Sequence, residues 1–335
     1  MQFQVPINIK TLPVGIQYGQ KILLSGSCFT EHIGDRLAEW KFNTLQNPNG
    51  ILFDPASVAS SLVSYIKPRV FASEDLFYLN ELWQSWQHHS RFSGMDKAQV
   101  LQQINASQQQ AHQFLKEADW LIITLGSSFS YRLSSEGAAQ SASIATAVAN
   151  CHRAPAQWFQ KHLLSIEEMN TVLDNCIHQL FHFNKKLQII FTISPVRHIR
   201  DGVTENNRSK ARLIEVVHHL VNKFDQLYYF PAYELVIDVL RDYRFYDIDM
   251  AHPNFAATQF VLEHFNKHCI HSNSNFLIEQ VQQITTARRH KAFQPATQAH
   301  QSFLKAHLEK ALQLQQQYPY LNFDEEINYF NKQLK

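Results

Sequence analysis

The chain alternates short apolar runs with long segments of helical periodicity, and this alternation limits its fold more than any other feature. Helical patterns such as AQVLQQINASQQQAHQFLKEA and SIEEMNTVLDNCIHQLFHFNKK separate runs rich in β-branched, aromatic and leucine residues. The runs that predict buried strands are residues 21–26, 120–126, 187–194 and 228–238. Strands that alternate with helices pair in parallel, because each connection must cross a face of the sheet. The sequence therefore predicts an α/β fold with one parallel sheet covered by helices on both faces.

Three further segments complete the predicted organisation. Residues 49–55 are either a short strand or a loop that closes over the carboxyl edge of the sheet. Residues 56–118 form a long, mostly helical insertion, and from about residue 270 the chain becomes Gln-rich and keeps one apolar helical face. We expect a main domain over residues 1–270 and a helical extension over residues 271–335, packed on that domain or on a partner chain.

Composition excludes several classes of protein. Lys and Arg number 30 against 29 Asp and Glu, so there is no electrostatic argument for a nucleic-acid or membrane partner. The first residues lack a basic segment followed by an apolar one, and no run approaches ~20 apolar residues. We therefore expect a cytoplasmic location. The cysteines lack C-x-x-C spacing, and His88 and His89 are not part of an H-x-x-x-H or H-E-x-x-H pattern, so we expect reduced thiols and no metal.

Polar segments follow three of the predicted strands. They are SCFT, GSSFSY and SPVRH, in chain order. In a parallel sheet the carboxyl ends of the strands share one edge, and ligands bind in the crevice beyond it. The first segment places Ser27 and Cys28 where a strand hands over to a helix. The sequence therefore predicts a nucleophilic site at this edge.

A second candidate group is the D-x-x-H of Asp249 and His252, just before Pro253 and a helical pattern. An acid three residues before a histidine can brace one imidazole nitrogen and leave the other to exchange a proton. The alternative is structural: Asp249 caps the following helix, with His252 in its first turn.

These strings together resemble the GSCFA family of the SGNH, or GDSL, hydrolase superfamily. GSCFTEH aligns with the first block of that superfamily, G-D-S-L-T-x-G, and DMAHPNFAAT aligns with its last, D-x-x-H-P-N-x-x-G. Further strings similar to the family are NPNGILFDP, TLGSSFSY, NCHRAP, TISPVRHIRDG with SKARL, and YFPAYELVIDVLRDYRFYDIDMAHP. The resemblance implies a three-layer α/β/α sandwich, flavodoxin-like in plan. It also implies a hydrolase or acyltransferase that needs no cofactor, with acyl-CoA as a possible donor for transfer.

The resemblance assigns catalytic roles. Aligned without gaps, Cys28 stands at the nucleophile position; a shift of one residue would put Ser27 there instead. His252 becomes the general base and Asp249 orients it. A thiolate is the stronger nucleophile, and a helix amino end lowers its pKa.

The resemblance also implies an oxyanion hole. The backbone N–H of Gly50 would be one donor. The third block lacks its usual Asn, so the substitutes are the Ser128 hydroxyl or the side chains of Asn47 and Asn150.

Other residues have open alternatives. On the loop 150–155, Asn150 and His152 line a site or form an ordinary loop, and Cys151 with His152 is a further Cys–His pair. Arg197 either clamps a substrate carboxylate or phosphate, or pairs with an acid of the chain, Asp201 or Glu234; His198 lies beside it. The Trp83, Trp86, His88 and His89 cluster is a sugar-stacking lid or the insertion's aromatic core.

Two classes of function remain. The first is an enzyme acting on an ester, including an O-acyl group of a carbohydrate or small metabolite. The second is a binding protein that keeps the fold and holds a glycan or small ligand without catalysis. Either could form a homo-oligomer.

Overall fold

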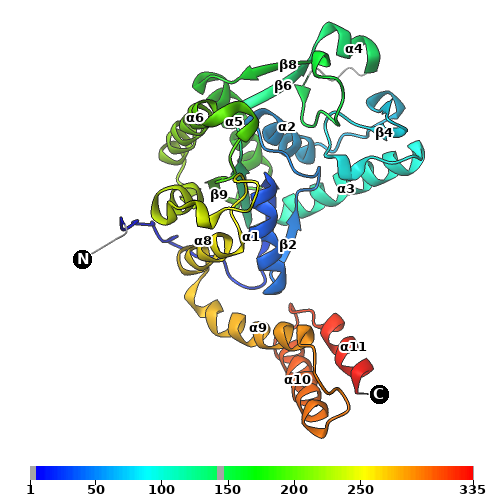
Figure 1. The fold of residues 1–335 in the computed structure, drawn as a ribbon, viewed down its shortest axis with the longest axis vertical. Helices are drawn as coiled ribbons and strands as arrows, with labels where there is room; N and C mark the ends of the chain where they lie inside the picture. Colours follow the sequence, from blue (N-terminus) through cyan, green and yellow to red (C-terminus); the bar gives the residue numbers. More distant parts are fainter. Residues whose placement is uncertain (1–4, 142–146, 335) are drawn as a thin grey trace.

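The computed structural model describes residues 5–141 and 147–334 and contains a central sheet of five parallel strands (Figure 1). The spatial order is β10-β9-β5-β1-β2. Numbered along the chain, this is the order 2-1-3-4-5 of flavodoxin-like folds, whose switch point lies between the first and third strands. The strands are β1 Lys21–Gly26, β2 Asn43–Gln46, β5 Trp120–Leu125, β9 Gln188–Ile193 and β10 Leu227–Phe230.

Helices cover both faces of this sheet. Alternate residues of each strand face opposite layers, so Leu23 packs into one core while Ile22 and Leu24 pack into the other. One layer contains α2 Pro55–Ile66, α3 Lys97–Glu117, α5 Ile166–Phe183 and α6 Gly202–Lys223. The other contains α1 Cys28–Glu39 and α8 Phe255–Cys269. The predicted three-layer α/β/α sandwich is confirmed.

One strand prediction is wrong in detail, and one strand of the sheet was not predicted. The fourth run ends as a strand at Phe230, because Pro231 has no N–H to continue the ladder. Residues after it are helical, as α7 Ala232–Glu234 and a π-helical segment, η5 Leu235–Leu240. The fifth strand is β2, which the sequence did not predict. Residues 49–55 form a loop, in which the Leu52 N–H donates to Gly26 O at 3.0 Å.

Small antiparallel sheets extend the helical insertion and the region after β5. A hairpin is formed by β3 Phe77–Leu79 and β4 Leu82–Gln84. A three-stranded sheet is formed by β6 Phe129–Leu133, β7 Ala147–Val148 and β8 Phe159–Leu163, next to α4 Ser135–Ser141. Short 3₁₀ turns occur at Ser73–Asp75, Ser90–Phe92, Ala156–Trp158, Ile199–Asp201, Tyr243–Phe245 and Ser272–Ser274.

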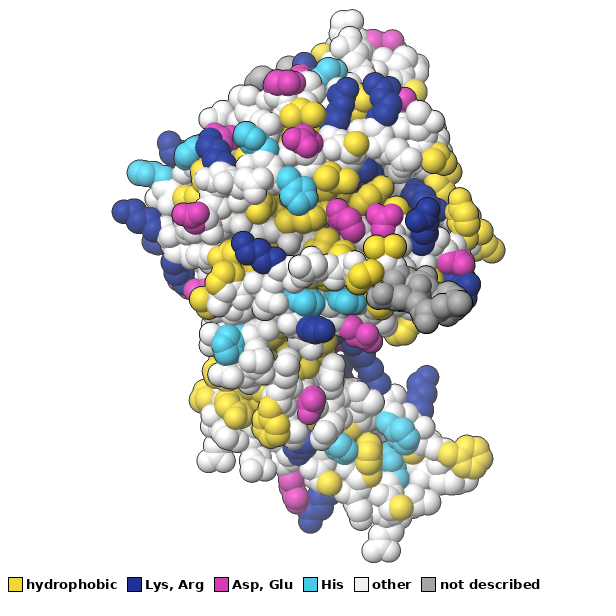
Figure 2. All heavy atoms as spheres, turned by 90° about the vertical axis from the view of Figure 1, so that its left-hand side faces the viewer, with side chains coloured by type: hydrophobic (Ala, Val, Ile, Leu, Met, Phe, Trp, Pro, Cys, Tyr) yellow, Lys and Arg dark blue, Asp and Glu magenta, His cyan; other side chains and the backbone are white. Residues whose placement is uncertain are grey.

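The C-terminal extension is helical, as predicted, and has a hydrophobic core of its own. Its helices are α9 Asn275–Arg289, α10 Gln298–Gln317 and α11 Asp324–Gln333. Figure 1 places them below α1 and β2, and Figure 2 shows them as a smaller lobe beneath the α/β unit. The boundary near residue 270 remains a prediction.

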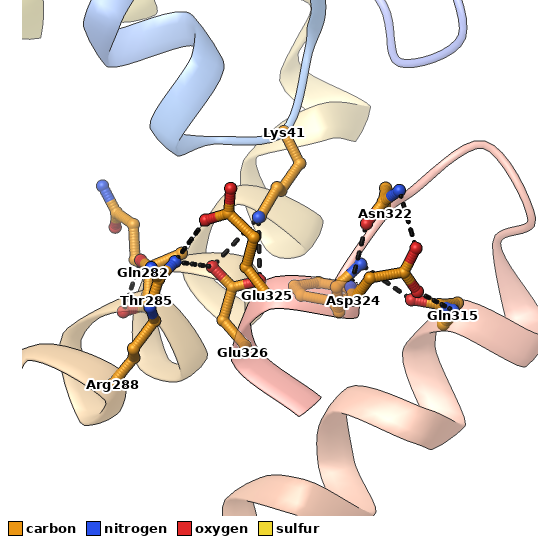
Figure 3. A network of polar contacts seen from close by, with 10 residues as sticks. Lys41, Gln282, Thr285, Arg288, Gln315, Asn322, Asp324, Glu325 and Glu326 are labelled. Carbon is orange, nitrogen blue, oxygen red and sulfur yellow. Dashed lines mark hydrogen bonds and ion pairs between the residues drawn. The ribbon is translucent and has the colours of Figure 1, made fainter. Parts of the chain in front are cut away.

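A polar network joins this lobe to the α/β unit (Figure 3). Lys41, just after α1, pairs with the buried carboxylate of Glu326 on α11 at 2.8 Å. Arg288 of α9 approaches the same carboxylate at 3.3 Å. Beside this pair, Tyr18 stacks on Phe42 with ring centroids 4.3 Å apart. We call the Lys41–Glu326 pair and these neighbours the junction.

The membrane question is answered only for the residues described. Between residues 5 and 141 and between 147 and 334, no helix combines the length and apolar character needed to cross a bilayer.

Candidate functional site

The turn between β1 and α1, residues 26–28, lies at the switch point of the sheet, and we call it the elbow. Gly26 has φ +150°, and a Cβ there would lie 2.2 Å from Thr124 O, so only glycine fits against β5. The Ser27 N–H donates to the same Thr124 oxygen at 3.0 Å. Ser27 is the N-cap of α1, and Cys28 is the first residue of the helix.

The two candidate nucleophiles of the elbow have different surroundings. Ser27 is 4% exposed, and its buried hydroxyl has no hydrogen-bond partner among residues 5–141 and 147–334. Cys28 is half-buried. Burial raises the pKa of the Cys28 thiol, whereas the Phe29 N–H acts to lower it. Cys28 is therefore the more accessible of the two, with the amino end of a helix available to a thiolate.

Asp249 and His252 form a braced pair. Asp249 accepts from the imidazole Nδ1 at 2.6 Å and from the N–H groups of Ala251 and His252 at 2.9 and 3.0 Å. The His252 N–H contributes most to lowering the pKa of Asp249 to about 2. The capping alternative is wrong, because the α8 cap is Asn254, which accepts from the Ala257 N–H. The arrangement leaves His252 Nε2 available for proton transfer.

His252 lies beside the helix that carries Cys28. It lines a cavity of about 400 Å³ together with His32 of α1. His32 follows Cys28 by four residues, and residues four apart share one face of a helix. Within the part of the chain that the structure describes, no hydrogen bond joins His252 to Cys28 or Ser27.

Two predicted oxyanion donors are already engaged, and these predictions are wrong. The Gly50 N–H donates to Asn47 O at 2.7 Å within a turn, and Gly50 has φ +81°. The Ser128 hydroxyl donates to Ser209 O at 3.1 Å. Both groups are committed to holding the local backbone.

Asn47 is the predicted donor that reaches the elbow. Its side-chain oxygen accepts from the Gly26 N–H at 2.9 Å, and its buried Nδ2 has no partner. An amide held in place by one bond and free at its nitrogen is the arrangement an oxyanion hole uses.

Asn150 and His152 lie on the loop after β7, and their bonds match the alternative of an ordinary loop, held here against the insertion. Asn150 accepts from the His152 N–H at 2.8 Å, and His152 Nε2 lies 2.8 Å from Ser85 O. Burial lowers the pKa of His152 to about 4. Trp86 is 1% exposed and stacks on Phe77 at 3.6 Å, as expected for an aromatic core and not for a lid.

Arg197 and His198 lie at the carboxyl edge, as predicted, and line a second cavity of about 360 Å³. The ion-pair alternative for Arg197 is wrong. Its guanidinium stacks over Tyr246 at 3.9 Å, while Asp201 pairs with Lys161 and Glu234 accepts from Tyr229. His198 Nε2 donates to Gly126 O at 2.8 Å, and burial lowers the pKa of His198 to about 4.

The sequence places Lys210 only near the start of the helix after SPVRH, without a catalytic role, whereas the structure buries it well inside α6. It is 1% exposed, and its Nζ donates to Gly126 O and Ser194 O, each at 2.6 Å. Burial lowers the pKa of Lys210 to about 7. The sequence held a signal: Lys210 occupies a core position of the helix, three residues before Leu213 in the buried stripe.

No metal centre accompanies these groups in the described residues, where no three His, Cys, Asp or Glu side chains are placed to share an ion.

Comparison with known proteins identifies the family. The model of the GSCFA family matches residues 21–265, and that of the GSCFA domain protein C-terminal domain matches residues 281–335. No curated protein matches the chain.

Two solved structures are distantly similar. A family two carbohydrate esterase from Clostridium thermocellum, in complex with cellohexaose, has 11% identity and a TM-score of 0.35 over 76% of this chain and 66% of that one. An acetyl xylan esterase from the rumen bacterium Butyrivibrio proteoclasticus has 8% identity and a TM-score of 0.33 over 76% and 64%. The chain thus spans just under two thirds of each. A likeness this weak carries no argument about chemistry.

Proposed function

The chain belongs to the GSCFA family, and we propose that it is an SGNH-type enzyme that hydrolyses or transfers an ester-linked acyl group. One observation carries the proposal. A half-buried thiol begins a helix at the switch point of the sheet, beside an unpartnered amide nitrogen of Asn47. Nucleophile, helix amino end and free donor are the parts that acyl transfer requires.

The proposed reaction has two halves. Cys28 attacks the ester carbonyl, and the Cys28 N–H and Asn47 Nδ2 stabilise the tetrahedral oxyanion. His252, oriented by Asp249, accepts the Cys28 proton and passes it to the departing alcohol. The thioester then passes its acyl group to water or to an acceptor hydroxyl that His252 deprotonates. Ser27 stays buried within the elbow and takes no part in this reaction.

We assign the alcohol portion of the substrate to the cavity of about 400 Å³ beside His252. That cavity is lined by polar and charged side chains, among them His32, Asp35 and Arg36. A general acid must contact the oxygen that leaves, so the group bound next to His252 is the alcohol. Hydrogen-bonding walls suit a hydroxyl-rich molecule, and an O-acylated carbohydrate is the substrate class that we favour.

Activity on p-nitrophenyl acetate tests the proposal. We expect wild type and Ser27→Ala to hydrolyse it, and Cys28→Ala and His252→Ala to lose about 10²-fold or more of kcat/KM. Cys151→Ala is the matched control, because it removes a half-buried thiol outside the elbow. Full activity in Cys28→Ala would refute the thiol mechanism.

A binding protein is the second candidate. The engagement of the Gly50 N–H and the Ser128 hydroxyl in local bonds favours it, since two expected oxyanion donors are missing. It predicts no ester turnover by any form of the protein, together with saturable glycan binding that His252→Ala weakens.

A further inference from the structure

Lys210 is a buried basic group that the proposed mechanism leaves unused. Its two hydrogen bonds end on the carbonyls of Gly126 and Ser194, the residues that directly follow β5 and β9. A neutral amine has two N–H donors and one lone pair, whereas an ammonium has three donors. Two carbonyl acceptors therefore satisfy a neutral amine completely and leave its lone pair free. The bonding pattern is that of a base.

Lys210 also lies directly beneath the elbow. Gly126, whose carbonyl it binds, touches the elbow so closely that a Cβ there would lie 3.3 Å from the Ser27 Cβ. Lys210 reaches this point from α6, in the layer opposite α1. His252 borders the α1 side, so the two basic groups approach the elbow from opposite faces of the sheet.

We propose that Lys210 is the proton acceptor of Cys28. As the sulfur attacks, the S–H bond breaks and an N–H bond forms on Nζ, giving a thiolate and an ammonium. The proton returns to the sulfur when the thioester is cleaved. His252 is then left to protonate the departing alcohol and to recover that proton from the incoming water or acceptor hydroxyl. This inference rests on the proposed function, since both use Cys28 as the nucleophile.

The groups that face this pair are few. His198, from the loop after β9, shares the Gly126 carbonyl with Lys210, and the Tyr233 ring of α7 has its centroid 5.9 Å from Nζ. A thiolate at Cys28 raises the pKa of Lys210, and a charged Lys210 lowers the pKa of Cys28, as expected for a coupled pair. Glu31 acts on Cys28 in the opposite direction and raises its pKa.

Alkylation with iodoacetamide tests the coupling without any ester substrate. The rate at each cysteine is followed by peptide mass spectrometry from pH 5 to 10, with Cys151 as an internal reference. We expect Lys210→Met to slow Cys28 alkylation at pH 7 by about tenfold or more and to move its pH profile upward. Lys186→Met, which removes an exposed lysine paired with Asp119, is the matched control and should leave the profile unchanged. A Cys28 profile in Lys210→Met within twofold of wild type would overturn the proposal.

A second measurement does not depend on the Lys210 variant folding. In protein labelled with ¹³C at lysine Cε, the Lys210 resonance should titrate near neutral pH in wild type. Its midpoint should fall in Cys28→Ala, because the thiolate that favours the ammonium is gone. A Lys210 that stays protonated to pH 10, or that titrates identically in both proteins, contradicts the pairing. If the coupling is found but no ester is cleaved, the proposed function fails while the dyad stands; if esters are cleaved with no coupling, only the dyad fails.

Discussion

One lysine lies next to the elbow and another at the junction, and their charges are compensated differently: Lys210 is 1% exposed, and the Lys41 side chain is 16% exposed. At the junction, Lys41 meets the carboxylate of Glu326 at 2.8 Å, with Arg288 on the same carboxylate. Next to the elbow, Lys210 donates to the carbonyls of Gly126 and Ser194, and no salt bridge forms on it among the described residues. The first lysine is neutralised by an opposite charge, and the second is not.

This difference separates a lysine that stabilises the structure from one that is available for proton transfer. A buried charge that is paired with an opposite charge can hold two surfaces together. A buried basic group without such a partner costs stability, and its pKa is shifted toward neutral pH. The elbow adds further costs, because the hydroxyls of Ser27, Thr30 and Thr124 are buried there without partners. Buried polar groups that cost stability without holding the structure together are typical of functional sites.

The largest expected effect is on activity. Lys210→Met should lower kcat/KM for p-nitrophenyl acetate by about 10²–10⁴-fold, since it removes a general base. Lys41→Met, the matched change at the junction, should leave kcat/KM within about twofold. Equal losses of kcat/KM in the two variants would show that the two lysines do not differ in function.

The free energy of unfolding, in contrast to activity, should depend on the junction lysine. Lys41→Met leaves the 3% exposed Glu326 side chain with Arg288 alone, and should lower the free energy of unfolding in urea by about 2–4 kcal/mol. Lys305→Met is the control: its pair with Glu309 spans 4.0 Å at the surface and should be worth under about 1 kcal/mol. A junction variant as stable as wild type would show that the pair does not hold the lobe.

The pH dependence of stability isolates Lys210. Its folded pKa of about 7 lies below the unfolded value of about 10.4, so the unfolded chain binds more protons between these values. Stability should therefore rise by about 2 kcal/mol from pH 7 to pH 9, relative to Lys210→Met. Urea unfolding of both proteins at the two pH values measures this difference. Parallel curves would mean that Lys210 is charged in the folded state.

The smallest effect concerns Ser27. Ser27→Ala removes a buried hydroxyl without a partner, so stability should stay within about 1 kcal/mol of wild type or increase, and esterase activity should change by less than about threefold. Ser61→Ala removes a hydroxyl that donates to Val58 O at 2.8 Å and should cost about 1 kcal/mol. If Ser27→Ala abolishes esterase activity while Cys28→Ala does not, Ser27 is the nucleophile.

Much of the fold could be predicted because its central strands are continuous apolar runs. β2 could not, since NTLQ is short and only partly buried. The hairpin β3–β4 turns on Asn80 and Glu81, both at positive φ, without the glycine that signals such a turn.

The site was predictable in part. The Asp249–His252 pair follows from local spacing, and the elbow from the strand-to-helix change. The sequence could not show that the Gly50 N–H is engaged, because that depends on the turn it closes. It could not show the environment of Lys210, because one of its two carbonyl partners follows β5, far from it in sequence.

α1 has the thiol at its first residue and ends just before Lys41. Twelve residues of helix form a stiff rod of about 18 Å. Its far end is gripped by the C-terminal lobe, through the Lys41–Glu326 pair and the bond of Arg289 to Glu39. A single continuous helix therefore connects the candidate nucleophile to the C-terminal lobe.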